Sequence, residues 1–433
     1  MRDSALKSNK RNSVNYLASC LTIPYIVISL LYIKTDNFRY ICFFLMILFI
    51  VGFFILKKKV HLRMKYAILI LFLILVTISF LSTSGLVESI KNTVMIILSF
   101  APIFIFDFFY LENSNDRKYA KIFLCFIIPV LLYTVFATLY YLYSDPQVAR
   151  EMVTWNPSSE VIDSTLPIAI GGGYALIYGV MLIPVVLFYI IRRIQCKAKM
   201  KLLYFILMLF FLYFIFRSGF TTAFLISLFG IYIVFLSNIQ HNKVLKMIII
   251  SVVTIIAGYL CIYFGVLDYI GGLLPSDSII SIRLNEIRPA LFNGNKISSF
   301  GLRLELLQKS FSAFINNPLF GVGYKVGQSY ANEGTLLGLH SEWVDNLGRY
   351  GIVMGLPYFS FIFLCFRDLI KKYKNTKYKD LIVILVCLII LLGFCNPIKT
   401  SSAFLFLFVV VPSYLNIEFH NSINNKKIIR GDG

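Results

Sequence analysis

Long apolar runs recur along the 433-residue chain, and short polar stretches separate most of them. The runs are about 15–22 residues long, close to the ~20 residues with which an α-helix crosses a bilayer. The pattern predicts an all-α integral membrane protein with about 12 transmembrane helices. The predicted spans are Val14–Ile33, Phe38–Leu56, Tyr66–Leu81, Thr93–Phe109, Ile122–Leu142, Gly173–Ile191, Leu202–Phe216, Thr221–Leu236, Met247–Leu267, Ile352–Phe366, Leu381–Cys395 and Ala403–Ile417.

The composition excludes an ordinary soluble domain, because 58% of the residues are apolar, 14% are charged and the mean hydropathy is +0.79. The first apolar run, Val14–Ile33, is longer than the core of a signal peptide, and no small-x-small cleavage motif follows it. We therefore expect this run to be retained as the first span.

The net charge of +20 suggests a nucleic-acid partner at first, but the positions of the charges favour a membrane explanation. With the N-terminus placed inside, the inner segments hold 28 of the 41 Lys and Arg residues, and the 13 others are matched by 13 Asp and Glu on the outer side. Because cytoplasmic connections are enriched in Lys and Arg, we expect both termini in the cytoplasm and no nucleic-acid partner. The inner segments are Met1–Ser13, Lys57–Lys65, Tyr110–Lys121, Arg192–Lys201, Ser237–Lys246, Arg367–Asp380 and the tail from Glu418.

One outer connection is large enough to form a small domain. Asp268–Gly351 contains 84 residues and Tyr143–Gly172 contains 30, whereas the other outer connections are short. The sequence thus predicts a membrane domain with spans 1–9 over residues 1–267, a large external loop over 268–351, and spans 10–12 with a cytoplasmic tail over 352–433. Since a long ordered loop usually has a function, we expect the chemistry to lie in the large one.

Within this loop, apolar residues at helical spacing predict an amphipathic helix that rests its apolar side on the membrane domain and turns Arg303 toward the same surface. Asn317-Pro318 is expected to end the helix, and Gly321 and Gly323 permit a backbone path closed to other residues. A second helical run is expected from near Ser341 to Leu347, with His340 just ahead of it. The apolar stripe of the first helix is Phe300, Leu304, Leu307, Phe311, Phe314 and Ile315.

Three ionisable residues are candidates for chemistry. Arg217 follows a predicted span, and the small polar turn after it favours a cavity over snorkelling to lipid phosphates. Arg303 either forms an ion pair with Glu305 or binds an anion, and its side of the helix favours the anion. His340 is either a solvated side chain without a role or a proton acceptor, because the unperturbed pKa of histidine lies near neutrality.

Other ionisable groups give weaker signals. Asp107 lies near the inner end of the fourth span, and we interpret it as an interfacial residue. With no Cys-x-x-Cys motif and one histidine on the outer side, the sequence predicts no metal site.

Taken together, these segments resemble the O-antigen ligase and polysaccharide polymerase family of multi-spanning membrane proteins. The motifs cover about a third of the chain, and the number of spans and the late external loop agree. Two positions depart from the family pattern: Leu307 stands where members often have Trp, and the turn at Arg217 often reads Ser-Arg-Gly. The motifs are Arg217-Ser218-Gly219, Gly301-Leu302-Arg303, the run Asn317–Gly323, and His340 before a helix that leads to Arg349-Tyr350-Gly351.

The resemblance implies transfer of a glycan from an undecaprenyl-pyrophosphate carrier to a sugar hydroxyl, on the outer face of the cytoplasmic membrane and without a metal or other cofactor. Arg217 and Arg303 would stabilise the pyrophosphate leaving group, and His340 would accept or orient the proton of the attacking hydroxyl. Gly321, Gly323 and Arg349 are expected to bind substrate. Besides the lipid-linked oligosaccharide and the bilayer, the implied candidate partners are chain-length regulator and flippase proteins.

The reaction predicted is polymerisation of lipid-linked repeat units into an O-antigen, a capsule or an exopolysaccharide. A ligase that transfers the finished chain to a terminal acceptor needs the same residues and stays an alternative. A transporter or flippase for lipid-linked sugars is the alternative of another class, although the predicted spans hold few of the charges that would line a path through the bilayer. A scaffolding protein would leave the arginine and histidine of the loop unexplained.

Overall fold

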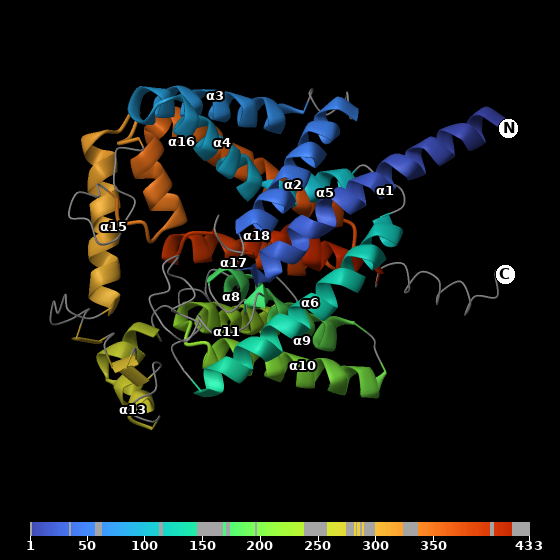
Figure 1. The fold of residues 1–433 in the computed structure, drawn as a ribbon. Coiled ribbons are helices and arrows are strands. Elements are labelled where there is room, and N and C mark those ends of the chain that lie inside the picture. Colours follow the sequence, from blue (N-terminus) through green and yellow to red (C-terminus); the bar gives the residue numbers. More distant parts are fainter. Residues whose placement is uncertain are drawn as a thin grey trace.

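Helices make up nearly all of the regular structure in the computed structural model (Figure 1). The structure describes residues 2–33, 36–56, 63–111, 116–144, 168–169, 174–194, 197–237, 258–273, 281–282, 284–285, 288–289, 299–323, 337–398 and 402–417. Its helices are α1 (Arg2–Leu30), α2 (Asp36–Leu56), α3 (Met64–Ser84), α4 (Leu86–Ser99), α5 (Ala101–Phe106), the π-helix η1 (Asp107–Leu111), α6 (Asp116–Ser144), α8 (Tyr174–Val180), α9 (Leu182–Arg193), α10 (Ala198–Arg217), α11 (Thr221–Leu236), α13 (Val266–Gly272), α15 (Ser299–Asn316), α16 (Glu342–Tyr373), α17 (Lys379–Cys395), α18 (Ala403–Leu405) and the π-helix η3 (Phe406–Val410).

Six of these helices are long and apolar enough to cross a membrane, and a bent pair is a seventh candidate. The bent pair was predicted as the single span Thr93–Phe109, but it turns by 47° between Ser99 and Ala101. Pro102, in the first turn of α5, cannot donate the backbone hydrogen bond that would continue α4. The helical membrane fold is confirmed, and the total of about 12 spans stays a prediction. The six are Ser13–Leu30, Met64–Leu81, Arg117–Tyr143, Leu176–Arg193, Ala198–Arg217 and Glu342–Tyr373.

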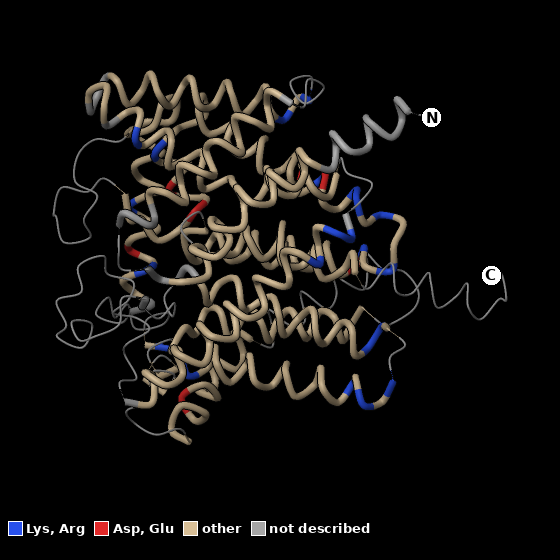
Figure 2. Tube along the Cα trace, turned by 45° about the vertical axis from the view of Figure 1, so that its right-hand side comes forward, with Lys and Arg blue, Asp and Glu red and all other residues tan. Residues whose placement is uncertain are grey.

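The spans run roughly side by side, with α3, α4 and α16 at the top of Figure 1 and α9, α10 and α11 at the bottom. α15 lies across the left end of the bundle, nearly perpendicular to the spans, and packs on the first part of α16. We call this end the loop end, and the opposite end, where α1 begins, the terminal end. Figure 2 shows Lys and Arg on the helix connections at the terminal end. This matches the separation of charge predicted from the sequence, and which side is cytoplasmic stays a prediction.

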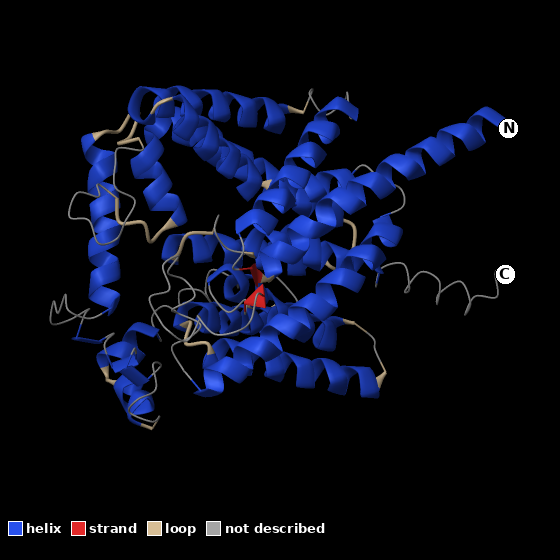
Figure 3. Cartoon of the chain, in the orientation of Figure 1, coloured by secondary structure: helices blue, strands red, loops and turns tan. Residues whose placement is uncertain are grey.

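Two short strands, not predicted from the sequence, pair antiparallel and are drawn in red in Figure 3. β1 (Tyr32–Ile33) pairs with β2 (Ile168–Ala169). The pairing joins the connection after the first span to the connection before the sixth.

Two helix breaks occur at glycines with positive φ. The ninth predicted span, Met247–Leu267, lies partly outside the described residues, and its described part is interrupted by a turn at Gly265 with φ of +72° before α13 begins. The predicted boundary between the second loop helix and the tenth span is confirmed, because α16 breaks at Gly351, with φ of +59°. Glycine adopts such angles without the steric penalty that a Cβ imposes.

The side of α15 that faces the protein is not the predicted apolar stripe. Gly301, Ser310 and Ala313 are buried, whereas Leu304, Phe311 and Ile315 are 39%, 50% and 59% exposed. The reason is a close approach of backbones: a Cβ at Gly338 would lie 2.0 Å from Leu306 O, and one at Gly348 would lie 2.7 Å from Ser310 O. Only small residues fit such a contact, so α15 uses its small side there. The side chain of Phe300 lies outside the described residues.

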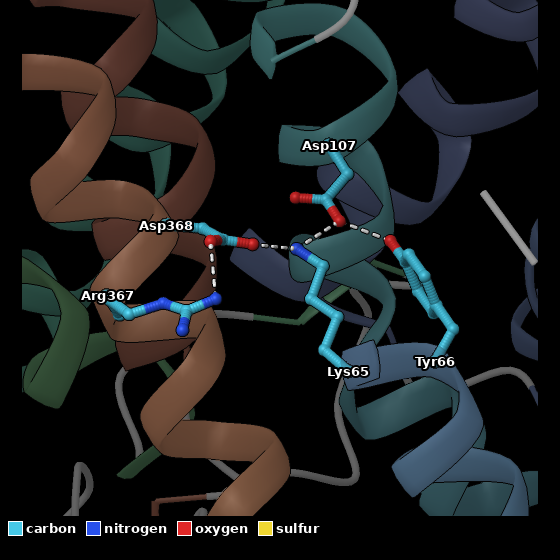
Figure 4. A network of polar contacts seen from close by, with 5 residues as sticks. All are labelled: Lys65, Tyr66, Asp107, Arg367 and Asp368. Atoms are coloured by element: carbon cyan, nitrogen blue, oxygen red, sulfur yellow. Dashed lines mark hydrogen bonds and ion pairs between the residues drawn. The ribbon is translucent and has the colours of Figure 1, made fainter. Parts of the chain in front are cut away.

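An ion-pair network joins α3, η1 and α16 near the terminal end (Figure 4). Lys65 Nζ lies 2.5 Å from Asp107 Oδ2 and 2.8 Å from Asp368 Oδ2, and the hydroxyl of Tyr66 donates to Asp107 Oδ2. Asp107 is fully buried, so its interpretation as an interfacial residue is wrong. Lys65 and Tyr66, from a neighbouring helix, offset the burial through Oδ2, whereas Oδ1 has no hydrogen-bond partner among the described residues.

Candidate active site

Arg303 joins the loop helix to the membrane domain. It lies in the second turn of α15, half-buried, and its Nη1 donates to Thr222 Oγ1 at 3.0 Å. Thr222 is in the first turn of α11, so the guanidinium lies at the start of a membrane helix. The structure therefore bears out the prediction that Arg303 turns toward the membrane domain.

His340 lies just before α16 begins, half-buried and within electrostatic reach of Arg303. Partial burial and the positive charge of Arg303 lower the pKa of the imidazole from its ordinary value, and a hydrogen bond with the backbone of Leu339 acts in the opposite direction. The structure thus brings together two predicted site residues that are 37 positions apart. A histidine with a lowered pKa is neutral at pH 7 and can accept a proton.

The backbone just before His340 is strained. Leu339 has φ of +57°, the one positive φ outside glycine in the described chain. A branched side chain rarely adopts this angle, and such conformations persist where surrounding contacts fix them, often at functional sites.

Arg217 is at the last position of α10, half-buried, and its Nη2 donates to Leu142 O at 3.2 Å. A turn through Gly219, with φ of +72°, leads directly into α11. Arg217 therefore precedes the start of α11 in the chain, and Arg303 reaches the same helix start through its hydrogen bond to Thr222.

The start of α11 has polar groups available for a ligand. The residue before it, Phe220, offers no side-chain cap, so no side chain at that position binds the first free N–H groups of the helix. The buried hydroxyl oxygen of Thr221 has no hydrogen-bond partner within the described part of the chain. An uncapped helix start with a positive dipole end attracts anions.

The glycine turn after α15 lies elsewhere. Gly321 and Gly323 have φ of +65° and +63°, and Gly323 N donates to Arg349 O at 2.9 Å. A Cβ at Gly321 would lie 2.3 Å from the same carbonyl oxygen, so the turn packs on the backbone of α16. Arg303 is 13 residues before the end of α15, which places it ~20 Å from the turn at 1.5 Å per residue. Substrate binding by Gly321, Gly323 and Arg349 stays a prediction.

Several buried polar residues near His340 were not singled out by the sequence. Glu342 accepts hydrogen bonds from Tyr358 OH at 2.6 Å, from the Asn346 amide and from Ile398 N at 2.9 Å. The sequence shows Glu342 and Asp345 as acids at a helix start, where the dipole alone explains them. Their burial and their long-range partners could not be seen from that pattern.

The arrangement offers cationic and neutral groups for chemistry on an anionic substrate. Two arginines and an uncapped helix start can bind phosphate oxygens, and a neutral imidazole beside them can accept a proton. Across the described ranges, no group of three or more His, Cys, Asp or Glu side chains is placed to hold a metal ion.

A comparison with protein families gives a match. Residues 203–359 match a family model described as O-antigen ligase. The matched region contains Arg217, Arg303 and His340, together with the glycine turn and Arg349. No curated protein matches the chain. The match confirms the resemblance inferred from the motifs: residues 203–359 are similar to the O-antigen ligase family.

Proposed function

We propose that the protein is a metal-independent glycosyltransferase that polymerises undecaprenyl-pyrophosphate-linked oligosaccharide units into surface polysaccharide. The observation that supports this most directly is that Arg303 both donates a hydrogen bond to Thr222 at the start of α11 and lies close enough to His340 to lower the pKa of its imidazole. The loop end then faces the periplasm or the cell exterior, and both termini face the cytoplasm, as the distribution of Lys and Arg favours.

In the proposed reaction, the acceptor hydroxyl attacks the anomeric carbon of the donor glycan. A new glycosidic C–O bond forms as the bond to the carrier pyrophosphate breaks, and the pyrophosphate leaves with the electron pair. The hydroxyl proton passes to His340, whose imidazole can accept it because the lowered pKa keeps the ring neutral at pH 7. Undecaprenyl pyrophosphate is the second product.

The arginines act on the leaving group. Negative charge on the pyrophosphate grows as the bond breaks, and positively charged donors placed beforehand stabilise that charge in the transition state. Arg303, held by Thr222, and Arg217, at the end of the preceding helix, supply planar guanidinium groups suited to phosphate oxygens. The free N–H groups at the start of α11 add to the same positive region.

A ligase is the second candidate, because the matched family model is described as O-antigen ligase. Its chemistry at Arg303 and His340 is the same, and the acceptor differs: a terminal molecule rather than another repeat unit.

The positions of buried charges favour an enzyme over a flippase. Among the described residues, the buried ionisable side chains of Lys, Asp and Glu are Lys65 and Asp107 near the terminal end, and Glu342 and Asp345 at the loop end. A flippase would need polar groups along its path through the bilayer.

The test is a gel of surface polysaccharide from a strain that lacks this gene and carries Arg303→Ala, His340→Ala or wild-type protein at equal membrane levels. For a polymerase, both variants lose the long-chain ladder while single repeat units still reach their acceptor. Long chains that stay on the lipid carrier would instead identify a ligase. Gln308→Ala, an exposed position of the same helix, is the matched control and is expected to keep the ladder. Normal polysaccharide in both site variants would refute the assignment.

A further inference from the structure

Hydrogen bonds connect the backbone on both sides of His340 to one pair of side chains, those of Ser310 and Asp345. The N–H of Gly338 donates to Ser310 Oγ at 2.8 Å, and the N–H of Ser341 donates to Asp345 Oδ2 at 2.7 Å. The hydroxyl of Ser310 in turn donates to Asp345 Oδ1. Ser310 is on α15 and Asp345 on α16, so three linked hydrogen bonds hold both ends of the histidine segment to two helices.

These hydrogen bonds lie in the interior. Ser310, Ser341 and Asp345 are all buried, and the bond from the backbone N–H of Ser341 to a carboxylate is of the charge-assisted kind. Removing one partner would leave a buried donor or acceptor unsatisfied, so the set holds its geometry as a unit.

The strained residue, Leu339, lies between the two hydrogen-bonded positions, Gly338 and Ser341. Leu339, with φ of +57°, follows Gly338 and precedes His340. Gly338 also touches the backbone of α15 at Leu306, where any side chain would collide. With Gly338 fixed on one side and Ser341 on the other, the backbone between them has little freedom, which accounts for the unfavourable angle.

We propose that Ser310 and Asp345 are positioning residues that hold His340 beside Arg303 in the orientation in which it accepts the proton. This inference rests on the proposed function. Neither residue touches the reacting atoms in this account, and Asp345 receives no proton, since both its oxygens are occupied by donors from the protein.

The first test measures steady-state transfer by full-length protein in proteoliposomes, with lipid-linked donor extracted from the strain that lacks this gene. Ser310→Ala and Asp345→Asn are expected to lower kcat by roughly 10²-fold, the effect of a misplacement of about 1 Å, with KM nearly unchanged. Ser312→Ala, an exposed serine of the same helix, is the matched control. Unchanged kcat in both Ser310→Ala and Asp345→Asn would overturn the inference.

A double-mutant cycle separates positioning from general stability. If Ser310 and Asp345 act through His340, then Ser310→Ala or Asp345→Asn introduced into His340→Ala lowers the residual rate no further. If the losses multiply, the pair supports the fold and not the histidine, and the inference fails while the proposed function stands. If His340→Ala alone keeps full activity, the proposed function fails, and the inference fails with it. Should Asp345→Asn fail to accumulate in the membrane, the Ser310→Ala arm decides.

Discussion

Arg303 Nη1 and Thr222 Oγ1 lie 3.0 Å apart, and this hydrogen bond connects a helix that crosses the end of the bundle to the first turn of a membrane helix. It fixes the direction of the guanidinium at the start of α11, next to the turn that follows Arg217. Thr222→Val keeps the shape of the side chain and removes the acceptor. We expect it to lower the transfer rate by about tenfold, since a hydrogen bond to a charged group contributes about 1.5–3 kcal/mol.

Arg303→Lys tests the planar fork of the arginine. Lysine keeps the positive charge but cannot bind two phosphate oxygens in parallel, so we expect it to recover little of the activity lost in Arg303→Ala. Transfer assayed at equal membrane levels checks this. Activity close to wild type would mean that charge alone is sufficient at this position.

The pH dependence of transfer is expected to report the protonation of His340. Because burial and Arg303 lower its pKa, the imidazole is neutral near pH 7, and the rate should fall as the pH drops below the ordinary histidine value of about 6.5. Removing the positive charge with Arg303→Gln raises the pKa of His340, so the acid limb of the residual activity should move to higher pH. A limb that moves to lower pH, or stays in place, would contradict the proximity of the two groups.

Gly321→Ala is expected to destabilise the protein. The new Cβ would lie 2.3 Å from Arg349 O, at a residue whose φ is +65°, so the contact between the turn and α16 cannot form as it is. We expect a loss of about 1–3 kcal/mol from the strained backbone alone. Thermal unfolding in detergent measures it. Gly52→Ala, inside α2 where a Cβ meets nothing within 4 Å, is the control and should not lower the unfolding temperature, since alanine favours a helix more than glycine does.

Lys65→Met is expected to destabilise the protein without affecting the chemistry. It leaves the buried carboxylate of Asp107 without its cation, which costs about 3–5 kcal/mol. Lys65 is in the first turn of α3, near the terminal end, whereas α15, which carries Arg303, lies across the opposite end of the bundle. The folded fraction should keep its rate of transfer.

Substitutions at two other residues of the ion-pair network around Lys65 test the same account. Adding Asp107→Leu to Lys65→Met should recover part of the stability, because the unpaired charge is then gone. Arg367→Ala removes a cation that is 59% exposed in the same network and should change the unfolding temperature little. A large effect of Arg367→Ala, or a double variant less stable than Lys65→Met, would contradict this account.

The sequence predicts the presence of α15, the break after Asn316 and the position of His340 before a helix, because each depends on neighbouring residues. It predicts the wrong buried side for α15. Periodicity shows which side of a helix is apolar, but it does not show which other segments pack against the helix. The contact is decided by Gly338 and Gly348, which lie about 30 and about 40 residues beyond α15's centre in the sequence. The pairing of Lys65 with Asp107 could not be predicted for the same reason, since 42 positions separate the two residues.

The exposed apolar side of α15 has a consequence for how the donor arrives. Much of the surface of three apolar side chains, Leu304, Phe311 and Ile315, is not covered by protein. The exposed polar residues Glu305 and Gln308 lie beside them on the helix. A helix that exposes both apolar and polar side chains is suited to the boundary between lipid and water. The pyrophosphate of a polyprenyl carrier travels at that same depth. The donor would then reach Arg303 by diffusion in two dimensions, within one leaflet, and its tail would never have to leave the bilayer.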